Sequence, residues 1–504
     1  MARASWFMKI LVAGGVIALL TYYSWWFTFG ISYSPWTLVL LPAALAYGVV
    51  QLLGNWIIYL RARRRSPPAR SEKGSEFTVD VFVTVYGEPE ELVERSLSAA
   101  TAMKGKHRTW LLDDGQDPAL ASLAARLGAG YLVRSDRRDA KAGNLNAALR
   151  RTDGEIVVIF DVDHAPQKDF LVETLGHFAD PDVGFVQVML TFANQQQSWV
   201  SMGAAETALD FYNPTSLGMD GMGGATLMGS NALIRRKALD SISGYQPGLA
   251  EDLATSLQLQ AAGWQSVYVP KPLAPGLAPP DLAAWFVQQF KWARGVFELL
   301  LTVYPRVFRR LTWGQRLSYA VRTTKYWIGP LVTVHLAATI FILILGDFEL
   351  RGVFHQYLRH IAPLAAADVM IRYAALRAWR HPSVQSTSLL RAIALVYSTW
   401  PTYTVAWIMA LTRTPLAFRA TPKEAGKHLP PLWLLPQLAA LSLLGLGLWY
   451  TVYFEHHRPS LLLAFALIQV LIQLRILMVW VTGENSILRH LSKRISMRVT
   501  KAPN

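Results

Sequence analysis

Two uninterrupted apolar segments lie near the start of the chain, at residues 10–29 and 36–60, and neither contains a charged side chain. As a helix, each is long enough to cross the hydrocarbon core of a bilayer, which is about 30 Å thick. The pattern predicts two membrane-spanning helices within residues 1–60. A signal peptide is the alternative for the first segment, but no small-residue cleavage site closes it.

A basic segment follows the second apolar segment, with the sequence Arg-Ala-Arg-Arg-Arg at residues 61–65. Basic residues next to spanning helices mark the cytoplasmic side of a membrane. We therefore expect residue 61 and the N-terminus to lie in the cytoplasm.

The pattern changes over residues 75–275, where short β-branched runs alternate with helical stretches. The clearest predicted strands lie at residues 79–86, 109–112, 156–160 and 185–190. Alternation of strands and helices is typical of a largely parallel α/β sheet. We expect an α/β cytoplasmic domain over 75–275 and interfacial helices over 276–325.

Residues 326–504 again contain long apolar segments. We expect four further spans, at residues 326–346, 357–378, 432–451 and 460–482. The segment 386–412 is interpreted as a surface-lying, broken helix, because counting it as a span would separate the basic loop 413–427 from the basic C-terminal tail. The prediction is six spanning helices, with both termini in the cytoplasm.

The composition agrees with a membrane protein, since 52% of residues are hydrophobic and only 16% are charged. The chain has no cysteine, which excludes disulfides, thiolate metal sites and cysteine nucleophiles. The formal net charge is +15. Much of the excess positive charge lies in predicted cytoplasmic loops, where it can interact with anionic lipid headgroups. We therefore expect membrane lipid as a partner and no nucleic acid.

Two acidic motifs directly follow predicted strands. Asp113 and Asp114 follow the strand at 109–112, and Asp161 and Asp163 follow the strand at 156–160. The carboxyl ends of parallel strands border the crevice where ligands bind. Alternate residues point to the same side of a strand, and paired carboxylates there suit Mg²⁺ or Mn²⁺ bridging a diphosphate. For Asp113 and Asp114, a turn stabilised by aspartate is the alternative.

Two further polar segments open predicted helices. Residues 141–146, Lys-Ala-Gly-Asn-Leu-Asn, present a cation and amides that suit phosphate at a helix N-terminus, although an ordinary helix start explains them equally. Glu251 and Asp252 follow a glycine-rich turn, and they could serve only to favour the helix dipole.

Downstream, Gln288, Lys291 and Trp292 lie at spacings that place them on one helix face. The same helix carries several other large apolar residues. An apolar anchor in the core is therefore the alternative for Trp292.

Together these motifs resemble the processive family-2 glycosyltransferases of the cellulose synthase and hyaluronan or chitin synthase type. The matching motifs are Asp113-Asp114-Gly115, residues 141–146, Asp161-x-Asp163, Glu251-Asp252 and Gln288-x-x-Lys291-Trp292. Residues 84–88 resemble the strand end near the nucleotide, and residues 418–423 resemble the gating loop of bacterial cellulose synthase. The resemblance implies a GT-A fold, with a Rossmann-like, mostly parallel sheet, inserted between transmembrane helices.

The resemblance also implies roles for individual residues. Asp252, beside Glu251, would be the general base, and Asp161 and Asp163 would hold Mg²⁺ or Mn²⁺ at the diphosphate. The implied donor-binding residues are Thr84, Tyr86, Glu88, Asp113, Asp114, Lys141, Asp161, Gln288, Lys291 and Arg294. Implied acceptor-binding residues are Trp292, Gly229 and Ser230, and implied gating-loop residues are Phe418, Thr421 and Lys423.

The sequence departs from the family pattern at three places. Ala250 replaces the threonine before the Glu-Asp pair, Lys291 replaces an arginine, and residues 227–230 lack an aromatic residue and a cysteine. Lysine keeps the positive charge but loses the planar guanidinium fork. The class of reaction implied by the resemblance is unaffected by these departures, but the resemblance does not specify the sugar or the linkage.

The implied activity is polymerisation of a β-linked polysaccharide, with a β-glucan made from UDP-glucose as the first choice, and its translocation across a bacterial inner membrane. Growing polysaccharide and accessory export proteins are the implied partners. The alternatives are a mannan or a chitin- or hyaluronan-like polymer, or a non-processive transferase acting on a lipid phosphate. Residues 483–504 are too few for a PilZ domain, so we expect no regulation through one in this chain.

Overall fold

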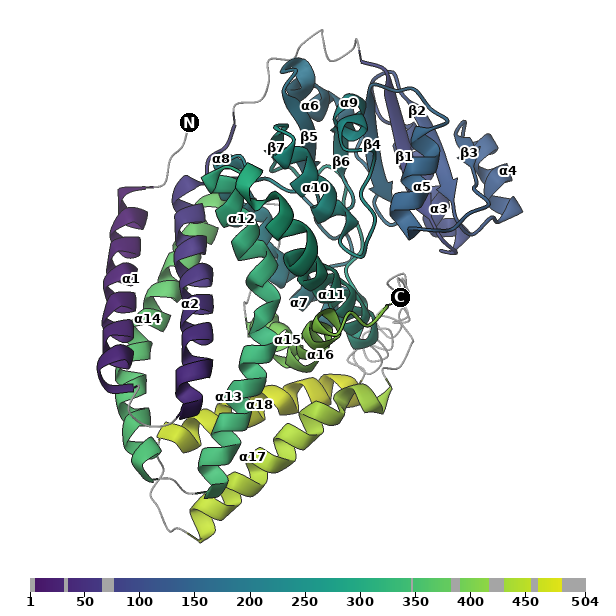
Figure 1. Cartoon of the computed structure of the whole chain (residues 1–504). Helices are drawn as coiled ribbons and strands as arrows, with labels where there is room; N and C mark the ends of the chain where they lie inside the picture. Colours follow the sequence, from purple (N-terminus) through teal and green to yellow (C-terminus); the bar gives the residue numbers. More distant parts are fainter. Residues whose placement is uncertain are drawn as a thin grey trace, which may run out of the picture.

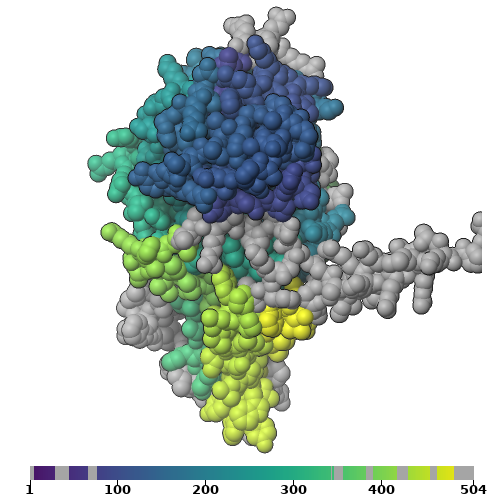
Figure 2. All heavy atoms as spheres, turned by 90° about the vertical axis from the view of Figure 1, so that its right-hand side faces the viewer, coloured from purple at the N-terminus to yellow at the C-terminus, as the bar shows by residue number. Residues whose placement is uncertain are grey.

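The computed structural model describes residues 5–30, 35–65, 77–345, 348–381, 390–416, 430–454 and 461–482. Strands and short helices form an α/β part, and long helices form a second part beside it (Figure 1). Viewed from the side, the α/β part lies above the long helices, of which α17 (Leu435–Tyr453) extends farthest down (Figure 2).

Seven strands form one sheet in the order β3-β2-β1-β4-β6-β5-β7. They are β1 (Val79–Val85), β2 (Arg108–Asp113), β3 (Gly130–Leu132), β4 (Ile156–Asp161), β5 (Val183–Val188), β6 (Ala232–Arg235) and β7 (Gln265–Val269). Only β6 runs antiparallel to its neighbours within this sheet, β4 and β5. The expected mostly parallel α/β sheet is confirmed.

The four predicted strands are present as β1, β2, β4 and β5, although β5 starts and ends earlier than predicted. The prediction missed β3, β6 and β7. β3 and β6 are short, and their pairing depends on neighbours distant in the chain.

Helices cover both faces of the sheet, which explains why its central strands are apolar on both sides. The flanking helices are α3 (Glu90–Thr101), α4 (Pro118–Arg126), α5 (Ala140–Leu149), α6 (Phe170–Thr174), α9 (Arg236–Ser241) and α10 (Glu251–Ala261). In β4, Ile156, Val158 and Phe160 join the core beneath α3 and α4, whereas Val157 and Ile159 join the core beneath α5 and α9.

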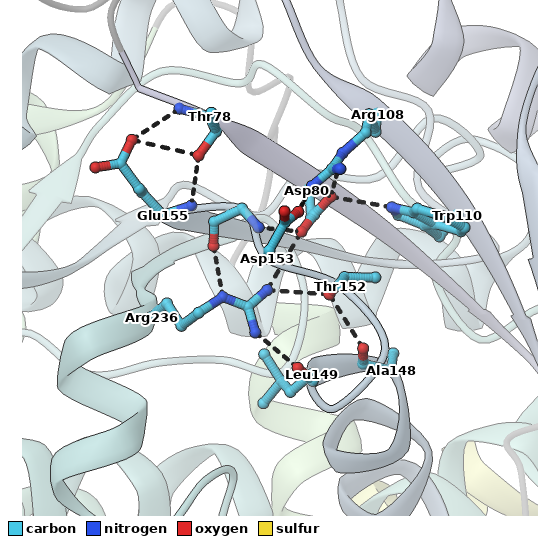
Figure 3. A network of polar contacts seen from close by, with 11 residues as sticks. Thr78, Asp80, Arg108, Trp110, Ala148, Leu149, Thr152, Asp153, Glu155 and Arg236 are labelled. Carbon is cyan, nitrogen blue, oxygen red and sulfur yellow. Dashed lines mark hydrogen bonds and ion pairs between the residues drawn. The ribbon is translucent and has the colours of Figure 1, made fainter.

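A buried carboxylate joins the elements at the amino end of β1 (Figure 3). Asp80 has no exposed surface and accepts hydrogen bonds from Arg108 Nε and Trp110 Nε1 at 3.0 Å each. The Gly154 amide donates to it at 2.6 Å, and Arg236 donates from α9 at 3.2 Å. Because both oxygens are bonded and two cations balance the charge, this end of the sheet is held together rather than left open to a ligand.

Long helices lie at all six predicted spans. They are α1 (Trp6–Trp25), extended by the turn Trp26–Gly30, α2 (Pro35–Arg61), α13 (Ile328–Leu345), α14 (Phe348–Trp379), α17, and α18 (Leu461–Thr482). Within the described residues, three helical segments are long and apolar enough to cross a membrane: Trp6–Thr28, Pro431–Tyr453 and Leu463–Val481. The count of six spans stays a prediction.

The predicted segment 386–412 contains two helices, α15 (Leu390–Ser398) and α16 (Trp400–Leu411), separated at Thr399. The break is anchored to α11 (Leu282–Val307), since Trp285 Nε1 donates to Thr399 Oγ1 at 2.9 Å and Tyr403 donates to Gln289 Oε1 at 2.7 Å. Further helices of the central region are α7 (Trp199–Asp210), the π-helix η5 (Phe211–Thr215), α8 (Ser216–Gly221) and α12 (Trp313–Thr324).

Candidate functional site

A cavity of about 510 Å³ lies at the carboxyl ends of β1 and β4 and continues to α7, α11 and α12. Segments that are far apart in the sequence line it together. Of the predicted site residues it is lined by Thr84, Tyr86, Glu88, Asp114, Lys141, Asp161, Asp163, Gly229, Ser230, Glu251, Asp252, Gln288, Lys291 and Trp292. The structure therefore brings most of the candidate donor, metal, base and acceptor residues to one place.

Asp161 ends β4 and is bonded from two sides. Lys141, at the start of α5, contacts its carboxylate and also donates to the Gly229 carbonyl at 2.7 Å. The Asp161 amide donates to Ser230 Oγ at 3.0 Å. Burial and Asp163 favour a higher pKa, but Lys141 outweighs them and holds the pKa of Asp161 below its usual value. The carboxylate is therefore kept ionised.

Asp163 and His164 complete a cluster in which one ligand atom of each residue, together with one of Asp161, lies within 4.8 Å of the others. Asp163 is 3% exposed, and its Oδ2 accepts a hydrogen bond from the Leu277 amide at 3.2 Å. Both ring nitrogens of His164 are buried and lack a hydrogen-bond partner among the described residues. Carboxylate oxygens suit Mn²⁺ or Mg²⁺, and an imidazole nitrogen can serve as a further ligand to a transition metal. The residues fit a divalent cation, and the unbonded imidazole is the sign of it.

Glu251 and Asp252 open α10 at the cavity wall. Burial and the adjacent Asp252 raise the pKa of Glu251 to about 7. Burial also raises the pKa of Asp252, against the opposing charge of Arg322. Two neighbouring carboxyl groups that the surrounding protein partly shields from solvent cannot easily both ionise. One of them is thus suited to taking up a proton near neutral pH.

Gly229 faces this pair with a backbone that disfavours a side chain, since its φ is +82°. A Cβ at this position would lie 3.7 Å from Asp252 Oδ2 and 3.8 Å from Lys141 Nζ. Glycine therefore leaves the space between the base candidate and the lysine open for a ligand.

Trp292 lies on α11 with Gln288 and Lys291, and all three line the cavity. The side chain of Trp292 is 39% exposed, whereas Trp285 and Phe286 of the same helix are each 2% exposed and belong to an apolar core. Trp292 is therefore not buried in that core, and it lines the cavity.

Two predicted donor-binding residues do not line the cavity. Asp113 is fully buried and accepts hydrogen bonds from the Gly115 and Asp117 amides at 2.6 and 2.8 Å, as a turn-forming aspartate does. Arg294 is 5% exposed and pairs with Glu298 at 2.7 Å.

Asp114 lines the cavity while forming a two-point ion pair with Arg134, with both contacts at 2.7 Å.

The predicted gating-loop residues Phe418, Thr421 and Lys423 lie outside the described residues.

Sequence reasoning missed several residues that line the cavity. They are Arg137, Gln289, Arg322, Lys325 and Tyr403. Arg322 and Lys325 carried a weak signal, because two cations three residues apart lie on one face of a helix. The others belong to no motif and reach the cavity only through the packing of helices that are distant in sequence.

Comparison with known proteins assigns the chain to a family. Residues 156–419 match the family described as glycosyl transferase family group 2, which is more than half of the chain. The chain therefore belongs to this family of glycosyltransferases, in agreement with the sequence motifs.

Curated relatives make the likeness more specific. The chain is 31% identical over 359 residues to cellulose synthase 1 of Komagataeibacter xylinus, covering 68% of this chain and 23% of the relative. It is 32% identical over 350 residues to the UDP-forming cellulose synthase catalytic subunit of Pseudomonas fluorescens (strain SBW25), covering 67% of this chain and 47% of the relative. The chain thus matches less than half the length of either relative.

Among solved structures, a mannosyltransferase from Pyrobaculum calidifontis in complex with GDP-Man and Mn²⁺ is similar over 74% of this chain and 98% of that chain. The two are 19% identical, with a TM-score of 0.49.

Proposed function

We propose that this protein is a membrane-embedded, processive, inverting glycosyltransferase that polymerises a β-glucan from UDP-glucose and moves it across the membrane. One observation carries the proposal: the Asp161–Asp163 pair, the Glu251–Asp252 pair and the exposed Trp292 line a single cavity. Membership in the family and the likeness to cellulose synthases support the choice of a glucan.

The proposed reaction assigns Asp252 as the general base. It would take the proton from the hydroxyl of the acceptor while that oxygen attacks the anomeric carbon of an α-linked donor, which inverts the linkage to β. The raised pKa of Asp252 suits this role, because a base works best when its pKa is close to the working pH.

The diphosphate of the donor would lie between Asp161 and Lys291. Mg²⁺ or Mn²⁺, held by Asp161, Asp163 and His164, would supply positive charge to the leaving diphosphate. Lys291 of α11 would add positive charge to the same group. Thr84, Tyr86, Glu88 and Asp114 would contact the nucleoside, as the family resemblance implies, because they line the cavity beside β1 and β2.

Trp292 would hold the acceptor. The C–H face of a pyranose packs well on an indole ring, and this ring is exposed in the cavity next to the proposed diphosphate site. Gly229 and Ser230 would line the space opposite, and 418–423 would act as a gating loop.

The test is to incubate the purified protein with separate UDP- and GDP-sugars and to digest the product with linkage-specific hydrolases. We expect a polymer from UDP-glucose that a β-1,4-glucanase degrades. A polymer from another donor would retain the reaction class and replace the sugar. A single transfer to a lipid phosphate would reject processive synthesis.

We also propose the organisation that goes with this activity. The regions are 1–60 with two spans, 75–275 as the GT-A catalytic domain in the cytoplasm, 276–325 as interfacial helices, and 326–504 with four spans, the interfacial segment 386–412 and the loop 413–427. The location is the bacterial inner membrane. Reporters fused after Arg65, after Lys427 and at the C-terminus should read cytoplasmic, and a periplasmic signal after Lys427 would mean that 386–412 spans.

A further inference from the structure

The wall of the cavity next to the long helices carries two cations that the proposed reaction assigns neither to the donor diphosphate nor to the metal. Arg322 lies in the last turn of α12, and Lys325 begins the following turn, Lys325–Trp327, which leads into α13. Both line the cavity. The Arg322 guanidinium lies 5.0 Å, and the Lys325 ammonium 6.0 Å, from the centroid of the same ring, Phe211 of η5. Two like charges therefore lie close together.

No carboxylate in the described part of the chain forms an ion pair with either cation. Arg322 donates to Thr226 Oγ1, a neutral hydroxyl. Asp210, the acid on this side, accepts hydrogen bonds from Tyr59 at 2.7 and 2.9 Å and pairs with Arg372 at 3.2 Å. Asp210 is thus already bonded to Tyr59 of α2 and Arg372 of α14.

One acid of the cavity lining, Asp252, interacts electrostatically with Arg322, since the charge of Arg322 opposes the rise in the pKa of Asp252, but no ion pair joins the two in the described residues. The side chains that α7, η5, α11 and α16 add to this wall include small, aromatic and amide groups, namely Ala204, Thr207, Ala208, Phe211, Tyr212, Gln289 and Tyr403. The surrounding protein, which displaces water, lowers the pKa of Lys325, and Arg322 lowers it further against the opposing charge of Asp210. An anion bound here would relieve the repulsion between the two cations.

We infer that Arg322 and Lys325 form a phosphate subsite on the acceptor side of the cavity, so that the enzyme prefers to start from an acceptor carrying a phosphate group. A phosphate monoester carries a charge of about −1.5 to −2 near neutral pH, which matches two adjacent cations better than one carboxylate does. Guanidinium can bind two phosphate oxygens at once, and an ammonium adds a compact charge. The inference rests on the proposed function and names the class of its first acceptor.

The diphosphate of the donor does not account for this pair. That group has cations of its own, Lys141 beside Asp161 and Lys291 on α11. Arg322 and Lys325 instead come from the helix and turn that lead into α13. The phosphate could belong to a soluble sugar phosphate or to a lipid headgroup, and these two sources share the chemistry that the subsite recognises.

The first measurement is binding of inorganic phosphate to the full-length protein in phosphatidylcholine nanodiscs, by calorimetry. We expect Arg322→Gln/Lys325→Gln to weaken this binding about tenfold or more, since two charge-assisted contacts are lost. Arg316→Gln is the matched control, because Arg316 also lies on α12 but its guanidinium stacks 4.8 Å from Phe308, away from the cavity. Equal thermal unfolding of the two variants verifies that the double variant is folded.

The second measurement is transfer from UDP-glucose to cellobiose and to cellobiose phosphate. We expect a KM about tenfold lower for the phosphorylated acceptor, and loss of that difference in the double variant but not in Arg316→Gln. Stimulation by polyprenyl phosphate in the nanodisc would assign the phosphate to a lipid, and its absence would assign it to a soluble acceptor.

Two outcomes would overturn the inference: equal KM values for the two acceptors, or inhibition by phosphate that is competitive with UDP-glucose and not with the acceptor. Phosphate binding that depends on Arg322 and Lys325 without any sugar transfer would reject the proposed function alone. Sugar transfer without phosphate binding would reject the subsite alone.

Discussion

Both ends of the central sheet carry aspartates, but their surroundings differ, since Asp80 has no exposed surface whereas the Asp161 side chain is 39% exposed. At the amino end, Asp80 receives hydrogen bonds from two arginines, a tryptophan and a backbone amide (Figure 3). At the carboxyl end, Asp161 and Asp163 lie beside His164, whose ring nitrogens have no hydrogen-bond partner in the described residues, although Nδ1 lies 3.6 Å from Asp163 Oδ1. The hydrogen-bonding capacity of Asp80 is satisfied within the protein, whereas the cluster at Asp161 and Asp163 is suited to binding a ligand.

The difference shows how to tell a structural carboxylate from a functional one. Burying a charge is costly unless cations and donors surround it. Asp80 meets that requirement within the protein and lines no cavity among those described. The cluster at Asp161 has one cation, Lys141, beside two carboxylates and an imidazole without a hydrogen bond, an arrangement that favours binding of a further cation.

The largest expected effect at the carboxyl end is removal of the metal. Full chelation with EDTA should abolish polymer formation, and Mn²⁺ or Mg²⁺ should restore it, because the cluster at Asp161 would otherwise leave the diphosphate charge without its main counter-ion. The measurement is incorporation of labelled glucose. Full activity after exhaustive chelation would mean that Lys141 and Lys291 neutralise the diphosphate alone.

The next effect concerns the proposed base. Asp252→Asn should lower polymer formation by about 10²–10⁴-fold, as expected for loss of a general base, while donor binding persists. The readouts are turnover and binding of UDP-glucose. Near-normal turnover in this variant would remove Asp252 from the mechanism.

Asp80→Ala should lower the stability of the protein without lowering its turnover, the opposite of Asp252→Asn. It leaves Arg108 and Arg236 without their buried partner, so the free energy of unfolding should fall by about 3–5 kcal/mol. Thermal unfolding in detergent measures the loss, and Asp80→Asn, which keeps an acceptor oxygen, should lose less. Turnover per folded molecule should stay normal below the unfolding transition. A loss of turnover without a loss of stability would show that Asp80 contributes to activity, and that the amino end of the sheet is not purely structural.

Two tryptophans of α11, the exposed Trp292 and the buried Trp285, should respond differently to replacement by alanine. Trp292→Ala should leave the protein folded and able to hydrolyse donor slowly, while chain extension collapses, and Trp292→Phe should restore part of it by keeping a flat ring. Trp285→Ala should instead cost about 3–5 kcal/mol of stability, because that ring is buried in the core. Equal loss of hydrolysis and extension in folded Trp292→Ala would reject an acceptor-specific role.

The smallest effect is a shift in pH dependence. The base acts as a carboxylate, and burial raises its pKa, so the rate should fall on the acidic side at a higher pH than for an ordinary aspartate. Glu251→Gln removes the adjacent acid and should move this limb to lower pH. The pH–rate profile measures the shift, with Glu94→Gln, an exposed acid paired with Arg126, as the control. An unmoved limb would show that Glu251 does not affect the ionisation of Asp252.

Much of the fold and of the candidate site could be predicted because it depends on local patterns. A strand buried on both faces is apolar along its length, as β1 and β4 are, and acids that follow such strands must lie at one edge of a parallel sheet. The helix face that holds Gln288, Lys291 and Trp292 follows from the helical repeat alone.

Other features depended on contacts between distant segments. The antiparallel β6 is short and acquires its direction from pairing with both β4 and β5. Asp113 and Asp114 are adjacent and chemically identical, yet one turns inward to bond backbone amides and the other faces the cavity.

Local sequence patterns are enough to predict the sheet class, the positions of the long apolar helices and the set of acids at the strand ends, because periodicity and charge act over a few neighbouring residues. The folded structure was needed to show that Trp292 is exposed, that Arg294 is buried beside Glu298, and that Arg322 and Lys325 lie over one ring at the cavity wall. Exposure and charge pairing depend on which distant elements pack together, and that packing is set by the whole chain.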